Sequence, residues 1–229
     1  MRSIFAWIGG ALFVASLASF AFTYGITLGA PAPDDAPVAM PMVVNVTLFS
    51  VFAMHHSLMA RTGAKAWITR TVPPALERSL YVWVASLLFL VVCWCWQPLP
   101  GWLWIASGPM AWVCRALPLL GAWLTFRAAG MLDPLELAGI RQLSGHARQV
   151  VFTAGGPFGL VRHPIYLGWL LIVFATPEMT MSRLVMAVTS SAYLVIAIPW
   201  EEAALVEAFG EKYRAYQRQV RWRLVPGLW

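Results

Sequence analysis

The chain has 229 residues, of which 60% are hydrophobic and only 11% are charged, and its mean hydropathy is +0.68. So little polar surface excludes a water-soluble globule of this length. We therefore predict an all-α fold, a polytopic helical bundle in the lipid bilayer, with a single domain over residues 1–229. Within this domain, residues 1–129 form the N-terminal helices and residues 130–229 form the C-terminal half.

Apolar runs divide the chain into segments close to the length that crosses a bilayer, about 20 residues. They predict six transmembrane helices at about residues 3–29, 39–60, 79–97, 109–129, 165–177 and 183–200. The fifth is short, and we expect it to form a hairpin with the sixth across Pro177-Glu178. The first apolar stretch, 4–30, is about twice as long as the core of a cleavable signal peptide, so we expect a retained helix.

Positively charged residues cluster in alternate loops and in the C-terminal tail. They are Arg61, Lys65, Arg70, Arg78, Arg127, Arg141, Arg148, Arg162, Lys212, Arg214, Arg218, Arg221 and Arg223. Because cytoplasmic loops carry the excess of Lys and Arg, we predict an integral protein of the bacterial inner (plasma) membrane with both termini in the cytoplasm. Arg183 and Arg115 are exceptions on the opposite side. The net charge of +6 then reflects topology and does not indicate binding to nucleic acid.

The tail carries apolar and aromatic residues at spacings of 4, 4, 3 and 4, namely Leu205, Phe209, Tyr213, Tyr216 and Val220. This spacing predicts one face of an amphipathic C-terminal helix at the membrane surface. Glu201 lies four residues before Leu205 on the same face, so its carboxylate needs a cation or several donors. Arg162 is its simplest partner. Alternatively, Glu201 and Glu202 bind a ligand that carries hydroxyls, amines or positive charge.

Arg162-His163-Pro164 precedes the predicted fifth span. Proline is tolerated as the first residue of a helix, so we expect a helix to begin at Pro164. The N–H groups of its first turn, the helix dipole, Arg162 and His163 would then form an anion site at the membrane rim. An anion site that faces carboxylates across a hairpin suits a zwitterionic, hydroxyl-bearing ligand such as S-adenosylmethionine.

Two ordered motifs occupy the C-terminal half. They are Gly156-Pro157-Phe158-x-x-Val161-Arg162-His163-Pro164-x-Tyr166-x-Gly168 and Glu201-Glu202-x-x-Leu205-x-x-x-Phe209-Gly210-x-x-Tyr213-x-x-Tyr216-x-x-x-Val220. With them, residues 150–226 resemble the isoprenylcysteine carboxyl methyltransferase and phospholipid methyltransferase superfamily. Nearly the whole chain looks like one branch of it, the methanethiol S-methyltransferases and NnrU-like proteins, on the motifs His56-Ser57-x-Met59-Ala60-Arg61, Glu77-Arg78-Ser79-x-Tyr81-Val82, Gly139-x-Arg141-Gln142 and Ala175-Thr176-Pro177-x-Met179-Thr180.

This resemblance implies an integral membrane methyltransferase that uses S-adenosylmethionine. The cofactor-binding residues that it implies are Arg162, His163, Pro164, Tyr166, Gly168, Glu201 and Glu202. The branch implies a small or lipophilic acceptor that enters from the bilayer, such as the thiol methanethiol. A thiol reacts as its thiolate, which a nearby cation or base favours, so we expect Arg141, Gln142 and His146 to be the catalytic residues that activate it.

Other functions stay open on the sequence alone. The acceptor is alternatively an isoprenylcysteine carboxylate or a phospholipid amine, and the protein is alternatively an NADPH-dependent membrane reductase or a non-catalytic NnrU-like protein. The absence of a G-x-G-x-x-G between a strand and a helix excludes a Rossmann-type methyltransferase. We expect no metal, since the chain has only four histidines. The three cysteines read as small core residues, and the oligomeric state is left open.

Overall fold

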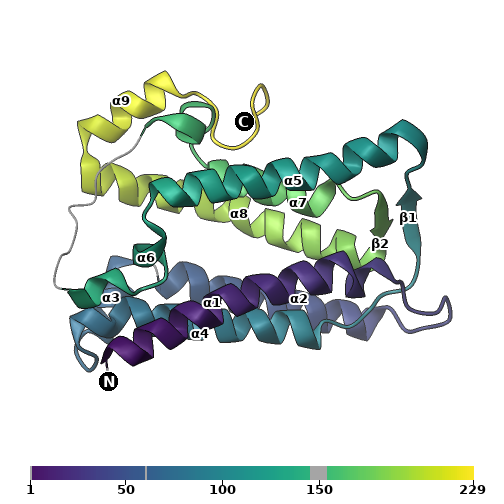
Figure 1. Ribbon diagram of the computed structural model, residues 1–229, viewed down its shortest axis with the longest axis horizontal. Coiled ribbons are helices and arrows are strands. Elements are labelled where there is room, and N and C mark those ends of the chain that lie inside the picture. The colour runs from purple at the N-terminus through teal and green to yellow at the C-terminus, as the bar shows by residue number, and fades with distance from the viewer. Residues whose placement is uncertain (1, 60, 145–153) are drawn as a thin grey trace. The chain divides into compact units, whose positions relative to one another are not determined.

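A computed structural model, which describes residues 2–59, 61–144 and 154–229, shows a chain that is mainly helical (Figure 1). Its helices are α1 (Arg2–Gly25), α2 (Ala39–Met59), α3 (Thr62–Ile68), α4 (Pro74–Cys95), α5 (Gly108–Met131), α6 (Pro134–Leu137), α7 (Pro164–Phe174), α8 (Met181–Phe209) and α9 (Glu211–Gln219). Short 3-10 helices cover Thr27–Gly29, Arg141–Ser144 and Gly156–Gly159, and the strands are β1 (Trp102–Ile105) and β2 (Glu178–Thr180). The prediction of an all-helical fold class is confirmed.

Each of the six predicted spans coincides with a helix, but two of the boundaries differ by five residues or more. Helix α4 begins at Pro74, five residues before the predicted span, because a proline at the first helical position already has the required φ. Helix α8 continues to Phe209, nine residues beyond the predicted end at residue 200. The apolar run stops at Trp200, whereas the charged residues that follow it still extend the same helix.

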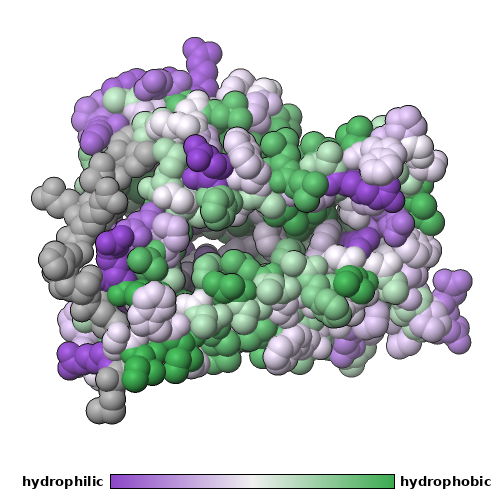
Figure 2. All heavy atoms as spheres, viewed as in Figure 1, coloured by the Kyte–Doolittle hydropathy of each residue, from purple (hydrophilic) through white to green (hydrophobic). Residues whose placement is uncertain are grey.

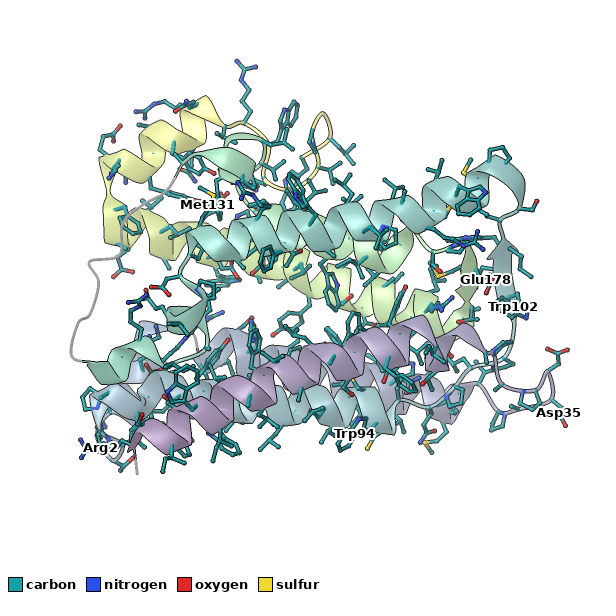
Figure 3. The ribbon with its side chains drawn as sticks, viewed as in Figure 1. Arg2, Asp35, Trp94, Trp102, Met131 and Glu178 are labelled. Carbon is teal, nitrogen blue, oxygen red and sulfur yellow. The ribbon has the colours of Figure 1, made fainter. Side chains whose placement is uncertain are left out.

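Among the residues that the structure describes, four helical segments are long and apolar enough to cross a membrane: Arg2–Gly29, Ala39–Met59, Pro74–Cys95 and Met181–Phe209. Large apolar side chains are exposed along the helices, as the hydrophobic surface in Figure 2 shows. Trp94 of α4, labelled in Figure 3, is 74% exposed. The chain is therefore a helical integral membrane protein. Six crossings stay a prediction, since α7 has 11 residues and α5, with its Trp, Gly, Pro and Arg residues, is less apolar than the four.

The chain divides into two compact units. The first contains Met1–Leu103, Asp133–Ala147 and Glu178–Thr189, and the second contains Trp104–Leu132, Arg148–Pro177 and Ser190–Trp229. Each unit contains residues from both sides of residue 130 in the sequence. They therefore differ from the two halves expected from the sequence, and a single domain over residues 1–229 stays a prediction.

In the first unit, α1 and α2 both pack against α4 (Figure 1). The ring of Phe89 on α4 stacks on Phe20 of α1 and on Phe52 of α2, with centroids 5.5 and 4.9 Å apart. The fully buried Asn45 of α2 donates to the backbone oxygen of Gln97 and accepts from its N–H, both at 2.8 Å. A buried amide with both ends bonded fixes the end of α4 against α2.

Arg183, one of the exceptions to the charge pattern of the loops, is a buried residue of the first unit and is 6% exposed. Its Nε and Nη2 donate to the carbonyl oxygens of Tyr24 and Gly25, at 3.0 and 2.7 Å, and its Nη1 donates to that of Glu178 at 2.5 Å. Figure 3 labels Glu178 on β2. Tyr24 and Gly25 end α1, so this side chain caps carbonyls that have no partner within the helix.

The second unit is organised by close packing of α7 against α5 (Figure 1). A Cβ atom added at Gly168 would lie 2.6 Å from the carbonyl oxygen of Gly121 and 2.3 Å from Oγ1 of Thr125. A Cβ atom at Gly121 would in turn lie 2.5 Å from the carbonyl oxygen of Gly168. Glycine at both positions therefore lets the two backbones touch, as small residues do between membrane helices.

The single helix predicted for the tail is interrupted. Helix α8 ends at Phe209, and Gly210 adopts a φ of +56°, which favours glycine, before α9 begins. The apolar stripe nevertheless packs together, because Tyr213, Tyr216 and Val220 form a buried cluster with Phe158, Leu205, Val206 and Phe209. The expectation of one continuous helix from Leu205 was wrong, and an association of α9 with the membrane surface stays a prediction.

Candidate active site

The residues just before α7 are held by the segment that follows α9, the C-terminal tail of residues 220–229, within the second unit. The backbone N–H groups of Arg162 and His163 donate to the carbonyl oxygens of Trp222 and Arg223, both at 2.9 Å. The next residue, Pro164, is fully buried and begins α7, as expected. The tail therefore lies alongside the residues that were expected to form an anion site.

The first N–H groups of that region are already bonded within the protein. Besides those of Arg162 and His163, the N–H groups of Tyr166 and Leu167 both donate to the carbonyl oxygen of His163, at 3.1 Å. An anion would therefore find few free donors in this backbone. The chemistry of the site depends instead on its side chains.

Arg162 forms a buried ion pair with Glu202. Its Nε lies 2.6 Å from Oε1 of Glu202, and the two side chains are only 7% and 5% exposed. Its Nη1 donates to the carbonyl oxygens of Val220 at 2.9 Å and Arg221 at 3.1 Å. The sequence suggested Glu201 as the simplest partner of Arg162, which was wrong. The guanidinium is turned toward Glu202 and the tail.

Glu202 gathers further donors around its carboxylate. Its Oε2 lies 3.3 Å from Nε of Arg223 and accepts from Nε2 of Gln217 at 3.2 Å. Its Oε1 lies 3.4 Å from Nε2 of His163. A buried carboxylate needs this many partners to offset its loss of hydration. Together these contacts tie α7, α8, α9 and the tail to one charged group.

Glu201 has a different environment from its neighbour. Its side chain is 44% exposed, compared with 5% for Glu202. The hydroxyl of Tyr166 donates to Oε1 of Glu201, and Nδ1 of His163 lies 3.6 Å from Oε2. The rings of His163 and Tyr166 stack, with centroids 5.4 Å apart and planes 11° from parallel. His163, Tyr166 and Glu201 thus form a polar face, whose one half-exposed carboxylate is open to a ligand.

Gly168 follows Tyr166 by two positions on α7. Its contacts with Gly121 and Thr125 of α5 show that it permits close helix packing. The motif that ends at Gly168 therefore combines polar groups with the residue that seats α7 on α5.

The aromatic residues Tyr213 and Tyr216 of α9 are buried beside Glu202. The Tyr216 hydroxyl donates to the carbonyl oxygen of Phe158 at 2.7 Å. Burial raises the pKa of Tyr216 to about 12, and it also raises the pKa of Tyr213. Both phenols thus stay neutral over the range in which proteins function.

Two of the residues expected to activate an acceptor, Arg141 and Gln142, lie in the first unit. Nε of Arg141 lies 2.6 Å from Oδ2 of Asp133, and Nε2 of Gln142 donates to the carbonyl oxygen of Glu136 at 3.4 Å. His146 lies outside the described residues. The catalytic role of Arg141, Gln142 and His146 stays a prediction.

Sequence reasoning did not anticipate the part played by Gln217, Arg223 and the carbonyl oxygens of Val220 and Arg221. The polar character of Gln217, one residue after the buried Tyr216, was the available signal. The carbonyl contacts carried no such signal, since every residue type has a backbone carbonyl. Within the described part of the chain, no group of three or more His, Cys, Asp or Glu residues is arranged to hold a metal ion.

Several curated proteins are similar to the chain over most of its length. It is 36% identical over 224 residues to the methanethiol S-methyltransferase of Mycobacterium tuberculosis, which covers 93% of this chain and 92% of that protein. It is 38% identical over 204 residues to the methanethiol S-methyltransferase of Pseudomonas deceptionensis, covering 85% and 78% of the two chains. A nurim of Sus scrofa is 31% identical over 184 residues, covering 72% and 68%. No protein-family model and no solved structure matches the chain.

The apolar helices and these relatives together define a class, the integral membrane methyltransferases. Within that class, the chain belongs to the family of the methanethiol S-methyltransferases. The resemblance inferred from the sequence motifs is confirmed, and the reductase and non-catalytic alternatives are not favoured.

Proposed function

We propose that the protein transfers a methyl group from S-adenosylmethionine to methanethiol. Similarity to a methanethiol S-methyltransferase over 93% of this chain and 92% of the relative carries this proposal. The methyl donor, when bound, supplies a sulfonium methyl carbon to which a thiolate forms a new C–S bond while the old bond breaks. The products would be dimethyl sulfide and S-adenosylhomocysteine, with the thiol proton passing to solvent.

The polar face of His163, Tyr166 and Glu201 fits the chemistry of this donor. S-adenosylmethionine carries an ammonium group, a sulfonium charge and ribose hydroxyls, all of which a carboxylate binds favourably. The Glu201 carboxylate is 44% exposed and bonded on one side by Tyr166. We assign Glu201, Tyr166 and His163 to direct binding. Arg162 and Glu202 then hold this face in position.

Pro164 and Gly168, also expected among the binding residues, have supporting roles in this proposal. Pro164 begins α7, and Gly168 seats α7 against α5. Both fix the rotation of the helix that carries Tyr166. A shift of about 1 Å in a binding group is enough to impair a transfer reaction severely, so these two residues would affect binding without touching the donor.

A membrane-embedded enzyme is suited to a small thiol acceptor. An alkyl thiol has a mostly apolar surface and enters lipid readily, so it would reach the protein from the bilayer. We assign its activation to Arg141, Gln142 and His146, because a nearby cation or base favours the reactive thiolate. By its chemistry the reaction needs alignment of the two reactants and exclusion of water more than acid–base power.

The test is a parallel assay of acceptors with the purified protein. S-adenosylmethionine labelled in its methyl group is supplied with methanethiol, a farnesylated cysteine analogue or an aminophospholipid. We expect volatile labelled dimethyl sulfide with methanethiol alone. Label found only in the farnesylated analogue or in the phospholipid would overturn the thiol assignment. Absence of transfer to all three by protein that is correctly folded would overturn the proposed activity itself.

A further inference from the structure

The first unit contains an apolar pocket that plays no part in the proposed function. It has a volume of about 180 Å³ and is lined by His55, Met59, Trp67, Ile68, Leu80, Tyr81 and Val84. These residues come from the end of α2, from α3 and from the first turns of α4. Nearly all of the lining surface is apolar. Hydrocarbon is therefore a favourable occupant.

The pocket lies at the ends of two candidate membrane spans, α2 and α4, next to the polar segment that connects them. Helix α2 ends at Met59 and α4 begins at Pro74, and both are apolar enough to cross a bilayer. Trp67 is 66% exposed, and tryptophan is enriched where hydrocarbon meets the headgroups. This places the pocket at the level of the membrane interface, within reach of both acyl chains and phosphate groups.

Three cationic residues, Lys65, Arg70 and Arg78, contact residues that line the pocket or lie within three positions of them in the chain. The Arg78 guanidinium lies 4.7 Å from the ring centroid of Tyr81, which lines it. Lys65 precedes the lining residue Ile68 by three positions on α3 and therefore shares its face. Arg70 is exposed just after α3.

These three cations are not neutralised locally. Residues 61–80 contain a single acidic residue, Glu77. Among residues 2–59, 61–144 and 154–229, no carboxylate forms an ion pair with Lys65, Arg70 or Arg78. The pocket therefore combines an apolar interior with a cationic rim.

We propose that this pocket binds an anionic phospholipid. Part of one acyl chain occupies the apolar pocket, and the phosphate group is bound by Lys65, Arg70 and Arg78. Charge complementarity distinguishes this ligand from a zwitterionic lipid, whose headgroup brings no net negative charge to the rim. The site depends only on the first unit, and it does not rest on the proposed transfer reaction.

The test is native mass spectrometry of the full chain, delipidated in detergent. Phosphatidylglycerol and phosphatidylcholine with the same acyl chains are added in turn. We expect retention of phosphatidylglycerol in preference to phosphatidylcholine. The Lys65→Gln/Arg70→Gln variant should lower that retention by about fivefold for each charge removed. Arg127→Gln, which removes an exposed arginine of the second unit, should leave it unchanged.

A second variant, Val84→Phe, fills the pocket without changing the charge. We expect it to reduce retention of phosphatidylglycerol while circular dichroism shows an unchanged helix content. If Val84→Phe does not fold, Leu80→Phe takes its place. Equal retention of the two lipids, or no effect of the Lys65→Gln/Arg70→Gln change, would overturn the proposal. The proposal would also be overturned if Val84→Phe raised the KM for methanethiol and left lipid retention unchanged. The pocket would then hold the acceptor and not a lipid.

Discussion

The Arg162 guanidinium and the Glu202 carboxylate form a buried ion pair with 2.6 Å between Nε and Oε1. The adjacent Glu201 is 44% exposed and bonds Tyr166 instead. Two successive carboxylates on one helix thus have separate tasks. One holds the tail and α7 together, and the other is available to a ligand.

The ion pair should be a major source of stability. Arg162→Ala would leave the Glu202 carboxylate buried with fewer partners and would free the tail carbonyls. Removing one partner of a buried pair costs about 3–5 kcal/mol, so we expect a clearly lower unfolding temperature in detergent. Glu211→Gln is the control, since the Glu211–Arg218 pair at 2.6 Å is largely exposed and should contribute little. Equal effects of the two changes would contradict this role of Arg162.

Glu201→Gln should separate binding from stability. The change removes the charge of a half-exposed carboxylate and preserves its shape. We expect affinity for S-adenosylmethionine to fall by about 1–3 kcal/mol, the scale of a charged hydrogen bond, with little change in the unfolding temperature. Titration calorimetry measures the affinity. The control is Glu207→Gln, an exposed carboxylate six residues further along α8. If both variants bind as the unaltered protein does, Glu201 does not contact the donor.

The sequence predicts the helices well because each apolar run is long compared with the uncertainty at its ends. It fails at Phe209 because charged residues that follow an apolar run can either leave the helix or continue it. Only tertiary packing decides between these outcomes. Tyr213 and Tyr216 pack together as their helical spacing predicted. The break in the helix at Gly210, which precedes them, was not expected.

The sequence predicted which residues gather at the candidate site, but it did not predict which carboxylate forms the ion pair with Arg162. Glu201 and Glu202 project about 100° apart on α8, so a small rotation of the helix decides which of them meets Arg162. Sequence spacing contains no information about that rotation. The pairing of Arg162 and His163 with the tail uses backbone groups, which no residue pattern identifies.

The close packing of α7 on α5 predicts that a larger residue at Gly168 destabilises the protein. A methyl group at Gly168 would meet the carbonyl oxygen of Gly121 at 2.6 Å, so Gly168→Ala should force the helices apart and lower the unfolding temperature. Overpacking of this kind costs about 1–3 kcal/mol. Gly130→Ala on α5 is the matched control, because a Cβ atom there meets nothing within 4 Å. It should be neutral or slightly stabilising through its helix propensity. Destabilisation by both variants to the same degree would argue against a packing role.

The buried phenol of Tyr216 predicts a loss of stability in alkali. Burial raises its pKa from 10.0 to about 12, so between these values the folded state holds a proton that the unfolded state releases. Its contribution is therefore complete below about pH 10 and is lost as the pH rises toward 12. Thermal unfolding between pH 8 and pH 11.5 should show this fall. Tyr216→Phe should reduce the slope while costing about 1 kcal/mol at neutral pH for the lost bond to Phe158. An unchanged slope in this variant would exclude Tyr216 as its source.

Arg183 bears on the predicted topology. Its guanidinium is buried and bonded to the carbonyl oxygens of Tyr24, Gly25 and Glu178, so its presence away from the other positive residues has a structural cause. The remaining pattern of Lys and Arg predicts that both termini face the cytoplasm. Reporter fusions after Arg70 and after Gly227 should both give a cytoplasmic signal. A fusion after Asp35 is the control and should give a periplasmic one, since that loop carries acidic residues and no Lys or Arg. A periplasmic signal after Arg70 or Gly227 would exclude the arrangement in which six crossings leave both termini in the cytoplasm.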